Sequence, residues 1–184
     1  MAEAIAPGVT EPFWRFLGDA CGVTPSMFRR IAADELPELA RPLLVHQRDM
    51  TSTLATFHGS ALHVEILQQR QSDGLYLREV FLRTVAASRM VEYGVIAIAL
   101  EQFAPAQQVE IRAGRTPLGG LLHQFQIPFE SSPICFVAVA TSALPGPLRA
   151  VLHGPICYGR FNRLARPAGA TLAWILEILP PDSA

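Results

Sequence analysis

Apolar side chains recur with two different periods along this chain, and the period changes near residue 60. In the first part, three large apolar residues stand at helical spacing behind Thr10, a plausible helix cap: Phe13, Phe16 and Leu17. Residues 25–45, which prolines interrupt, are expected to form one or two short helices. A further helix should begin at Asp49 or Thr51 and end at Gly59, where glycine favours termination. The first 60 residues are therefore predicted to be mainly helical.

Beyond this point, apolar residues concentrate or alternate with polar ones in runs of strand length. Six segments are predicted strands: 62–66, 75–83, 90–100, 134–141, 158–166 and 171–179. The turn sequence Ser-Asp-Gly at 72–74 should join the first two of them as a hairpin. A short helix is expected at 117–125. Helices that precede hairpin-linked strands indicate an α+β fold with an antiparallel sheet.

Composition and charge favour a single domain over residues 1–184, mainly helical in 1–60 and carrying the sheet with inserted helices in 61–180. Half of the residues are apolar and the mean hydropathy is +0.26, which excludes a disordered chain. The formal net charge is −1, and all 15 basic residues are arginine. This balance gives no support to a nucleic-acid partner, which needs clustered positive charge. Because lysine is absent, Schiff-base catalysis and a phosphate-binding P-loop are excluded.

No pattern indicates export, a membrane span or a bound metal. The N-terminal residues lack the cationic and apolar blocks of a signal peptide, and the longest apolar runs are too short to cross a bilayer. We therefore expect a cytoplasmic protein. The five histidines lack ligand spacing, so neither a metal nor another cofactor is expected. The three cysteines are interpreted as small buried side chains: Cys21, Cys135 and Cys157.

Two charged residues stand out because their predicted strands are otherwise apolar. Arg78 lies in LYLREVFLR (75–83), and Glu177 lies in LAWILEILPP (172–181). Charges inside core strands are costly unless they are paired or hydrogen-bonded. In one interpretation, the two residues pair with each other or face solvent at a sheet edge. In the other, Arg78 binds an anionic ligand within a pocket and a desolvated Glu177 handles a proton.

The same strands carry a resemblance to the chorismate lyase (chorismate–pyruvate lyase) family of ubiquinone biosynthesis. Four segments resemble family motifs in the same order: LLVHQRDMTSTL (43–54), LREVFL (77–82), GRTPLGGLL (114–122), and YGRFNRL (158–164) with LEILPP (176–181). Together they span residues 43–181. The resemblance implies an α+β fold, a single antiparallel sheet of about six strands with helices packed on it.

This resemblance also implies an activity and a set of site residues. The activity is the elimination of pyruvate from chorismate to give 4-hydroxybenzoate, with no cofactor. Arg78 would hold a ligand carboxylate, and Glu177 would lie beside the reacting ring carbon as the acid–base group. Met50 and Leu118 would line the substrate site and offer backbone groups. The implied partner is a small aromatic or cyclohexadienyl carboxylate, bound by a monomer or a small homo-oligomer without nucleic acid or membrane.

One position departs from the family pattern. The family has a second arginine on the strand after LREVFL, and that position falls on Tyr93 or Gly94 here. Glu92 would add negative charge if it faced the pocket. Three other arginines are candidates for the missing clamp: Arg89, Arg160 and Arg163. Arg160 and Arg163 are three positions apart, so on a regular strand they face opposite sides and only one can enter the pocket.

Two other functions remain open beside the chorismate lyase hypothesis. The first is a related enzyme that acts on another small carboxylate, in a pocket altered by the missing arginine. The second is a non-catalytic ligand-binding domain, because the effector domains of some bacterial transcription regulators look like this fold. Those domains follow a DNA-binding helix-turn-helix, and the first 60 residues here lack the basic face that such a module needs.

Overall fold

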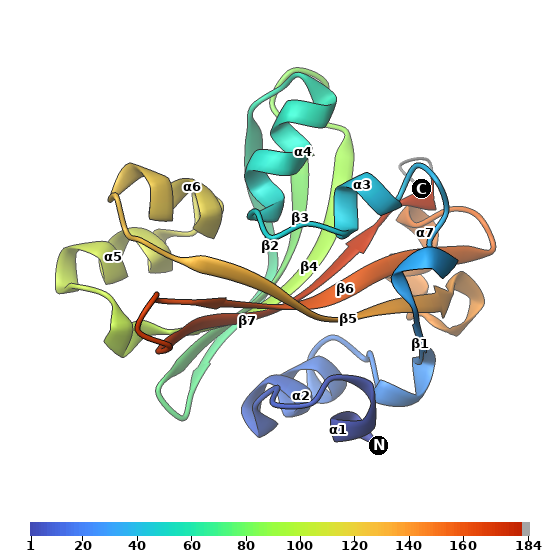
Figure 1. Ribbon diagram of the computed structural model, residues 1–184, viewed down its shortest axis with the longest axis horizontal. Helices are drawn as coiled ribbons and strands as arrows, with labels where there is room; N and C mark the ends of the chain where they lie inside the picture. The colour runs from blue at the N-terminus through green and yellow to red at the C-terminus, as the bar shows by residue number, and fades with distance from the viewer. Residues whose placement is uncertain (182–184) are drawn as a thin grey trace.

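The core of the protein is one antiparallel sheet of seven strands in the order β1-β5-β6-β7-β4-β3-β2 (Figure 1). The computed structural model describes residues 1–181, so the last three residues of the predicted domain lie outside it. The strands are β1 (Phe28–Ile31), β2 (Leu62–Ser72), β3 (Leu75–Thr84), β4 (Met90–Ala99), β5 (Glu130–Ala140), β6 (Ile156–Ala165) and β7 (Thr171–Leu179). All six neighbouring pairs are antiparallel. The central strand is therefore β7, which pairs with β6 on one side and with β4, a strand far from it in the sequence, on the other.

Helices cover both faces of the sheet (Figure 1). On one face lie α1 (Ala2–Ile5), α2 (Glu11–Asp19) and α7 (Gly146–Val151), and on the other lie α3 (Arg41–Leu44), α4 (Met50–His58), α5 (Pro105–Ala113) and α6 (Leu118–Gln124). Four short 3-10 turns connect these elements: Pro25–Met27, Ala33–Glu35, Leu100–Gln102 and Thr141–Ala143. No described helix is long enough and apolar enough to span a membrane.

The two faces of the sheet have different interiors. Beneath α2, an aromatic cluster formed by Phe13, Trp14, Phe28 and Phe161 packs with ring centroids 5.2 to 6.3 Å apart. This face is continuously apolar over much of its area. The face beneath α3–α6 carries two smaller apolar clusters. Buried charged side chains lie on this second face, and they form the site described below.

The strand count differs from the prediction of about six, because residues 25–45 contain the short strand β1 rather than helices alone. Its four residues have the burial pattern buried, exposed, exposed, buried, which matches the i, i+3 spacing of a helix and not the alternation of a strand. The strand exists because Phe28–Ile31 pairs with Phe136–Val139 of β5, more than 100 residues away. A local pattern does not report such a long-range pairing.

Candidate functional site

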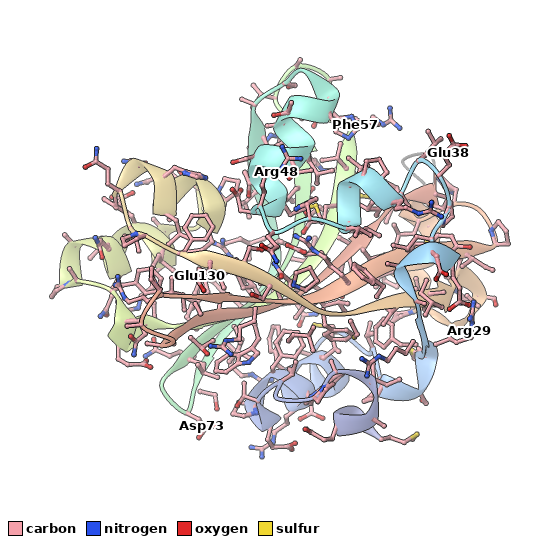
Figure 2. The ribbon with its side chains drawn as sticks, in the orientation of Figure 1. Arg29, Glu38, Arg48, Phe57, Asp73 and Glu130 are labelled. Carbon is pink, nitrogen blue, oxygen red and sulfur yellow. The ribbon has the colours of Figure 1, made fainter. Side chains whose placement is uncertain are left out.

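A cavity of about 50 Å3 lies between the second face of the sheet and the N-terminal ends of α4 and α6. Side chains from three central strands form most of its floor: Arg78, Val80, Glu92, Gly94, Ile96 and Glu177. The first residues of the two helices form its roof: Asp49, Met50, Thr51, Pro117, Leu118 and Gly119. In Figure 2, Arg48 marks the segment that leads into α4, on the side of the sheet opposite α1 and α2.

The four site residues expected from the sequence all line this cavity. Arg78 is on β3, Glu177 on β7, Met50 at the start of α4 and Leu118 at the start of α6. The register explains why the two charged residues share a face, because Gly94 of β4 lies opposite Glu177 on one side and Val80, two residues beyond Arg78, on the other. Arg78 and Glu177 do not pair with each other, since Glu177 has a different partner.

That partner is Arg160, which is fully buried and donates from Nε to Oε2 of Glu177. Its Nη1 donates to the carbonyl oxygens of Leu44 at 2.8 Å and His46 at 3.1 Å, and its Nη2 donates to that of Arg48 at 3.4 Å. The guanidinium therefore ties β6 and β7 to the segment before α4. With these donors engaged, Arg160 is not free to hold a ligand carboxylate.

Arg78 differs from Arg160 because some of its donors have no partner within the described part of the chain. Its side chain is 2% exposed, and neither Nε nor Nη1 has a hydrogen-bond partner among the described residues. Burial lowers the pKa of Arg78, but an arginine starts so high that the side chain stays charged. A buried cation with unpaired donors is costly, and here it faces a cavity. The arrangement is suited to a bidentate contact with a carboxylate.

Glu92 also faces the cavity, so the carboxyl group considered there from the sequence is one of its lining groups. The side chain is 4% exposed, and its Oε2 has no hydrogen-bond partner within residues 1–181. Burial and the nearby Glu177 carboxylate raise the pKa of Glu92 well above its ordinary value. Burial likewise raises the pKa of Glu177, although Arg160 opposes that shift. The cavity thus holds two carboxyl groups whose pKa values burial raises, one of them paired with Arg160.

The two sequence positions compared with a second arginine lie on opposite faces of the sheet. Gly94 lines the cavity, whereas the neighbouring Tyr93 faces the opposite side and donates its hydroxyl to Glu79 at 2.8 Å. A Cβ atom at Gly94 would lie 3.1 Å from Oε1 of Glu92, so the carboxyl group of Glu92 leans over this glycine. Arg89 is exposed, and Arg163 donates to the carbonyl of Gly169 at 2.8 Å; neither lines the cavity. Among residues 1–181, the one arginine that lines it is therefore Arg78.

The roof contains a polar contact that sequence reasoning missed. Asp49 caps α4 by accepting from the backbone N–H of Ser52 at 2.8 Å, and its other oxygen lies 3.0 Å from Nε2 of His123 on α6. Gly119 allows this approach, because a Cβ there would come within 2.4 Å of Oδ1 of Asp49. Ser52 Oγ lies 3.3 Å from the same Nε2. One nitrogen cannot relay a proton between both groups, so this is a link between helices rather than a catalytic triad.

Comparisons with known proteins concern the fold. No family model matches the chain, and no curated protein matches it. The structure is similar to that of gene product SA0254 from Staphylococcus aureus subsp. aureus N315, with a TM-score of 0.50 and 9% identity over 72% of this chain and 87% of that one. It is also similar to the C-terminal domain of the histidine utilization repressor from Pseudomonas syringae pv. tomato str. DC3000, with a TM-score of 0.43 and 12% identity over 67% and 94% of the two chains. At 9% identity, the first similarity shows that the two proteins share a fold.

Proposed function

We propose that this protein binds a small organic carboxylate in the cavity, with Arg78 as its anchor. The observation that carries the proposal is the buried guanidinium of Arg78, whose Nε and Nη1 atoms lack partners among the described residues. Apolar side chains beside it, Val80 and Ile96, suit the ring or chain of such a ligand. A ligand carboxylate would supply the hydrogen bonds that the protein does not.

Binding measurements with 4-hydroxybenzoate test this anchor. Arg78→Ala should weaken binding by roughly 10- to 100-fold, the usual worth of a charge-assisted hydrogen bond. Arg78→Lys should not restore it, because an ammonium group cannot reproduce the planar fork of a guanidinium. Arg30→Ala is the matched control, since Arg30 is exposed on β1 and does not line the cavity. Equal affinities for wild type and Arg78→Ala would overturn the proposal.

The first catalytic activity to test is the elimination of pyruvate from chorismate. Its support is the placement of Glu177, a buried carboxyl with a raised pKa, on the same cavity as Arg78. Glu177 would act as general acid–base at the scissile ether or the adjacent ring carbon. Chorismate is a dianion, however, and the described cavity offers it one free arginine and the carboxyl of Glu92. The geometry therefore supports a small monocarboxylate better than chorismate.

Incubation with chorismate distinguishes catalysis from binding. Formation of both pyruvate and 4-hydroxybenzoate supports the elimination, and Glu177→Gln should then lower the rate by about 10²- to 10⁴-fold. Glutamine keeps an oxygen for Arg160, so thermal unfolding should show that the variant folds. Carboxylate binding without turnover favours a ligand-binding domain. Equal turnover by wild type and Glu177→Gln would remove Glu177 from the mechanism.

A further inference from the structure

We propose that the ligand of this cavity carries a cationic group, such as an amine, at the end opposite its carboxylate, and that Glu92 selects it. The inference rests on the proposed function, because it takes Arg78 as the carboxylate anchor. It adds the chemistry at the other end of the ligand and names Glu92 as the residue that determines specificity.

The sheet register places the backbone positions of Arg78 and Glu92 at different places along the floor of one cavity. Arg78 lies opposite Ile96 of β4, and Glu92 lies four residues before Ile96 on that strand. Four residues of strand span about 14 Å, so the two backbone positions are well separated along the sheet. Both side chains face the cavity, and the Glu92 carboxyl leans over Gly94 toward its centre. A ligand that touches both groups would lie along the cavity floor.

The partners of the other charged residues leave these two unsatisfied. Arg160 and Glu177 bind each other, and Asp49 is held by His123 and by the N-terminus of α4. Arg78 and Glu92 retain polar atoms without hydrogen-bond partners among the described residues. Buried charges of opposite sign are tolerated when each is paired. A ligand with a carboxylate at one end and a cationic group at the other would pair with Arg78 and Glu92 at once. A ligand with a second carboxylate would instead place that group against Glu92.

The environment of Glu92 agrees with such a ligand. Burial raises its pKa, and the groups that act on it are Glu177 on β7, Arg160 on β6 and Asp49 before α4. In the empty cavity this favours a neutral carboxyl, which lowers the cost of burial. An ammonium group would favour the ionised form instead, so binding would release the proton of Glu92 to solvent. The cavity then contains two ion pairs rather than two unpaired groups.

Three benzoates of similar shape provide the test. They are 4-(aminomethyl)benzoate, which is zwitterionic, 4-ethylbenzoate, which is a monoanion, and terephthalate, which is a dianion. Isothermal titration of the wild-type protein should show 4-(aminomethyl)benzoate binding at least about tenfold more tightly than 4-ethylbenzoate, with terephthalate weakest. This comparison needs no variant, so it does not depend on the folding of a mutant.

Glu92→Gln should abolish the preference by weakening 4-(aminomethyl)benzoate about tenfold and leaving 4-ethylbenzoate nearly unchanged. Glu79→Gln is the matched control, because Glu79 is a buried glutamate on β3 that faces the opposite side of the sheet and should leave the preference intact. Titration in two buffers of different ionisation enthalpy should show proton release with the zwitterion for wild type and none for Glu92→Gln.

The outcomes separate this inference from the proposed function. If 4-ethylbenzoate binds wild type as tightly as the zwitterion, or if the preference persists in Glu92→Gln, the role of Glu92 is overturned while carboxylate binding stands. If Arg78→Ala binds 4-ethylbenzoate as wild type does, the anchor itself is wrong. Binding of none of the three benzoates overturns both.

Discussion

Arg78 and Glu92 show what single residues contribute to this site at a cost to the fold. Each is almost completely buried, and each keeps at least one polar atom without a hydrogen-bond partner among residues 1–181. An unsatisfied buried polar group costs roughly 1–3 kcal/mol, and more when it is charged. An apolar pair would make a more stable floor for the cavity. Their presence is the residue-level argument for a ligand, because a ligand can recover the hydrogen bonds that folding leaves unmade.

Glu92→Gln should make the stability of the protein less sensitive to pH. Burial raises the folded-state pKa of Glu92 well above 4.5, its ordinary value. The unfolded chain then loses this proton at a lower pH than the folded chain, so stability falls as the pH rises from about 4.5 through the folded-state pKa. Glutamine mimics the neutral carboxyl and does not titrate. Thermal unfolding at about pH 5 and about pH 8 should show a smaller loss of stability in the variant.

The exposed residue Glu101 provides the control for this measurement, since Glu101→Gln should leave the pH profile of the wild type unchanged. Glu177 also has a raised pKa, so some pH dependence should remain in Glu92→Gln. Identical profiles for wild type and Glu92→Gln would show that Glu92 does not titrate differently in the folded protein.

At the scale of elements, the position of the roof depends on Arg160. Its guanidinium bridges Glu177 of β7 and three backbone carbonyls between Leu44 and Arg48, just before α4. Few apolar contacts could set the position of α4 as specifically, because carbonyl groups accept only in defined directions. The same arginine therefore fixes the α4 side of the cavity roof and keeps the Glu177 carboxyl in place.

Arg160→Met should lower the free energy of unfolding by about 3–5 kcal/mol, since it leaves Glu177 and the carbonyl groups buried without their donor. The double variant Arg160→Met/Glu177→Leu should recover a large part of that loss, because neither member of this ion pair is then left buried without the other. Urea unfolding of the two single variants and the double variant measures the coupling. Additive effects would contradict the view that the pair acts as a unit.

The sequence predicted well the elements that carry strong local signals, and it predicted poorly those that depend on contacts with distant residues. The predicted segment 171–179 has the bounds of β7, and α4 begins behind Asp49 and ends before Gly59 as expected. These elements carry strong local signals, namely an apolar run, a capping carboxylate and a terminal glycine. In contrast, β1 depends on pairing with β5. The short helix α7 and the helix α5 were also missed, because their apolar faces are narrow.

In the candidate site, too, residues with a local signal could be predicted and contacts between distant residues could not. Arg78 and Glu177 could be singled out because a charge within an apolar strand is conspicuous, and strand alternation allowed one of Arg160 and Arg163 to face the pocket. The partner of Glu177 could not be chosen from the sequence, since the carbonyl groups that hold Arg160 lie more than 110 residues away. The link between Asp49 and His123 joins two helices 74 residues apart and has no local signature.

On the scale of the whole molecule, the sheet separates an apolar layer from the layer that contains the cavity. Helix α2 lies on one face of the sheet, and α4 and α6 lie on the other (Figure 1). The aromatic cluster around Phe13 packs between α2 and the sheet, while the cavity lies between the sheet and the helices α4 and α6. Each strand contributes alternate residues to the two layers. A substitution in the core on the α2 side should therefore change the free energy of unfolding more than it changes the ligand affinity of the folded protein.

Phe13→Ala tests this separation. Removal of a fully buried phenylalanine should lower the free energy of unfolding by about 3–5 kcal/mol. The affinity for 4-hydroxybenzoate, measured at a temperature where the variant is fully folded, should stay within about twofold of wild type because Phe13 does not line the cavity. A tenfold loss of affinity in folded protein would show that the two layers are coupled.

The neighbouring positions of Arg78 and Glu79 have a consequence for folding fidelity. The side chain of Arg78 points into the cavity. The side chain of Glu79 points to the opposite face, where Tyr93 and Gln68 donate to its carboxylate. A slip of β3 by one residue against β4 would exchange the two faces. The cavity would then hold three glutamate carboxyl groups beside Asp49 and no free arginine, and a guanidinium would enter the layer around Tyr93. Burial of these charges costs free energy in the native register, and it would cost more in the shifted register. The charges therefore favour the native pairing of β3 with β4 over the shifted one.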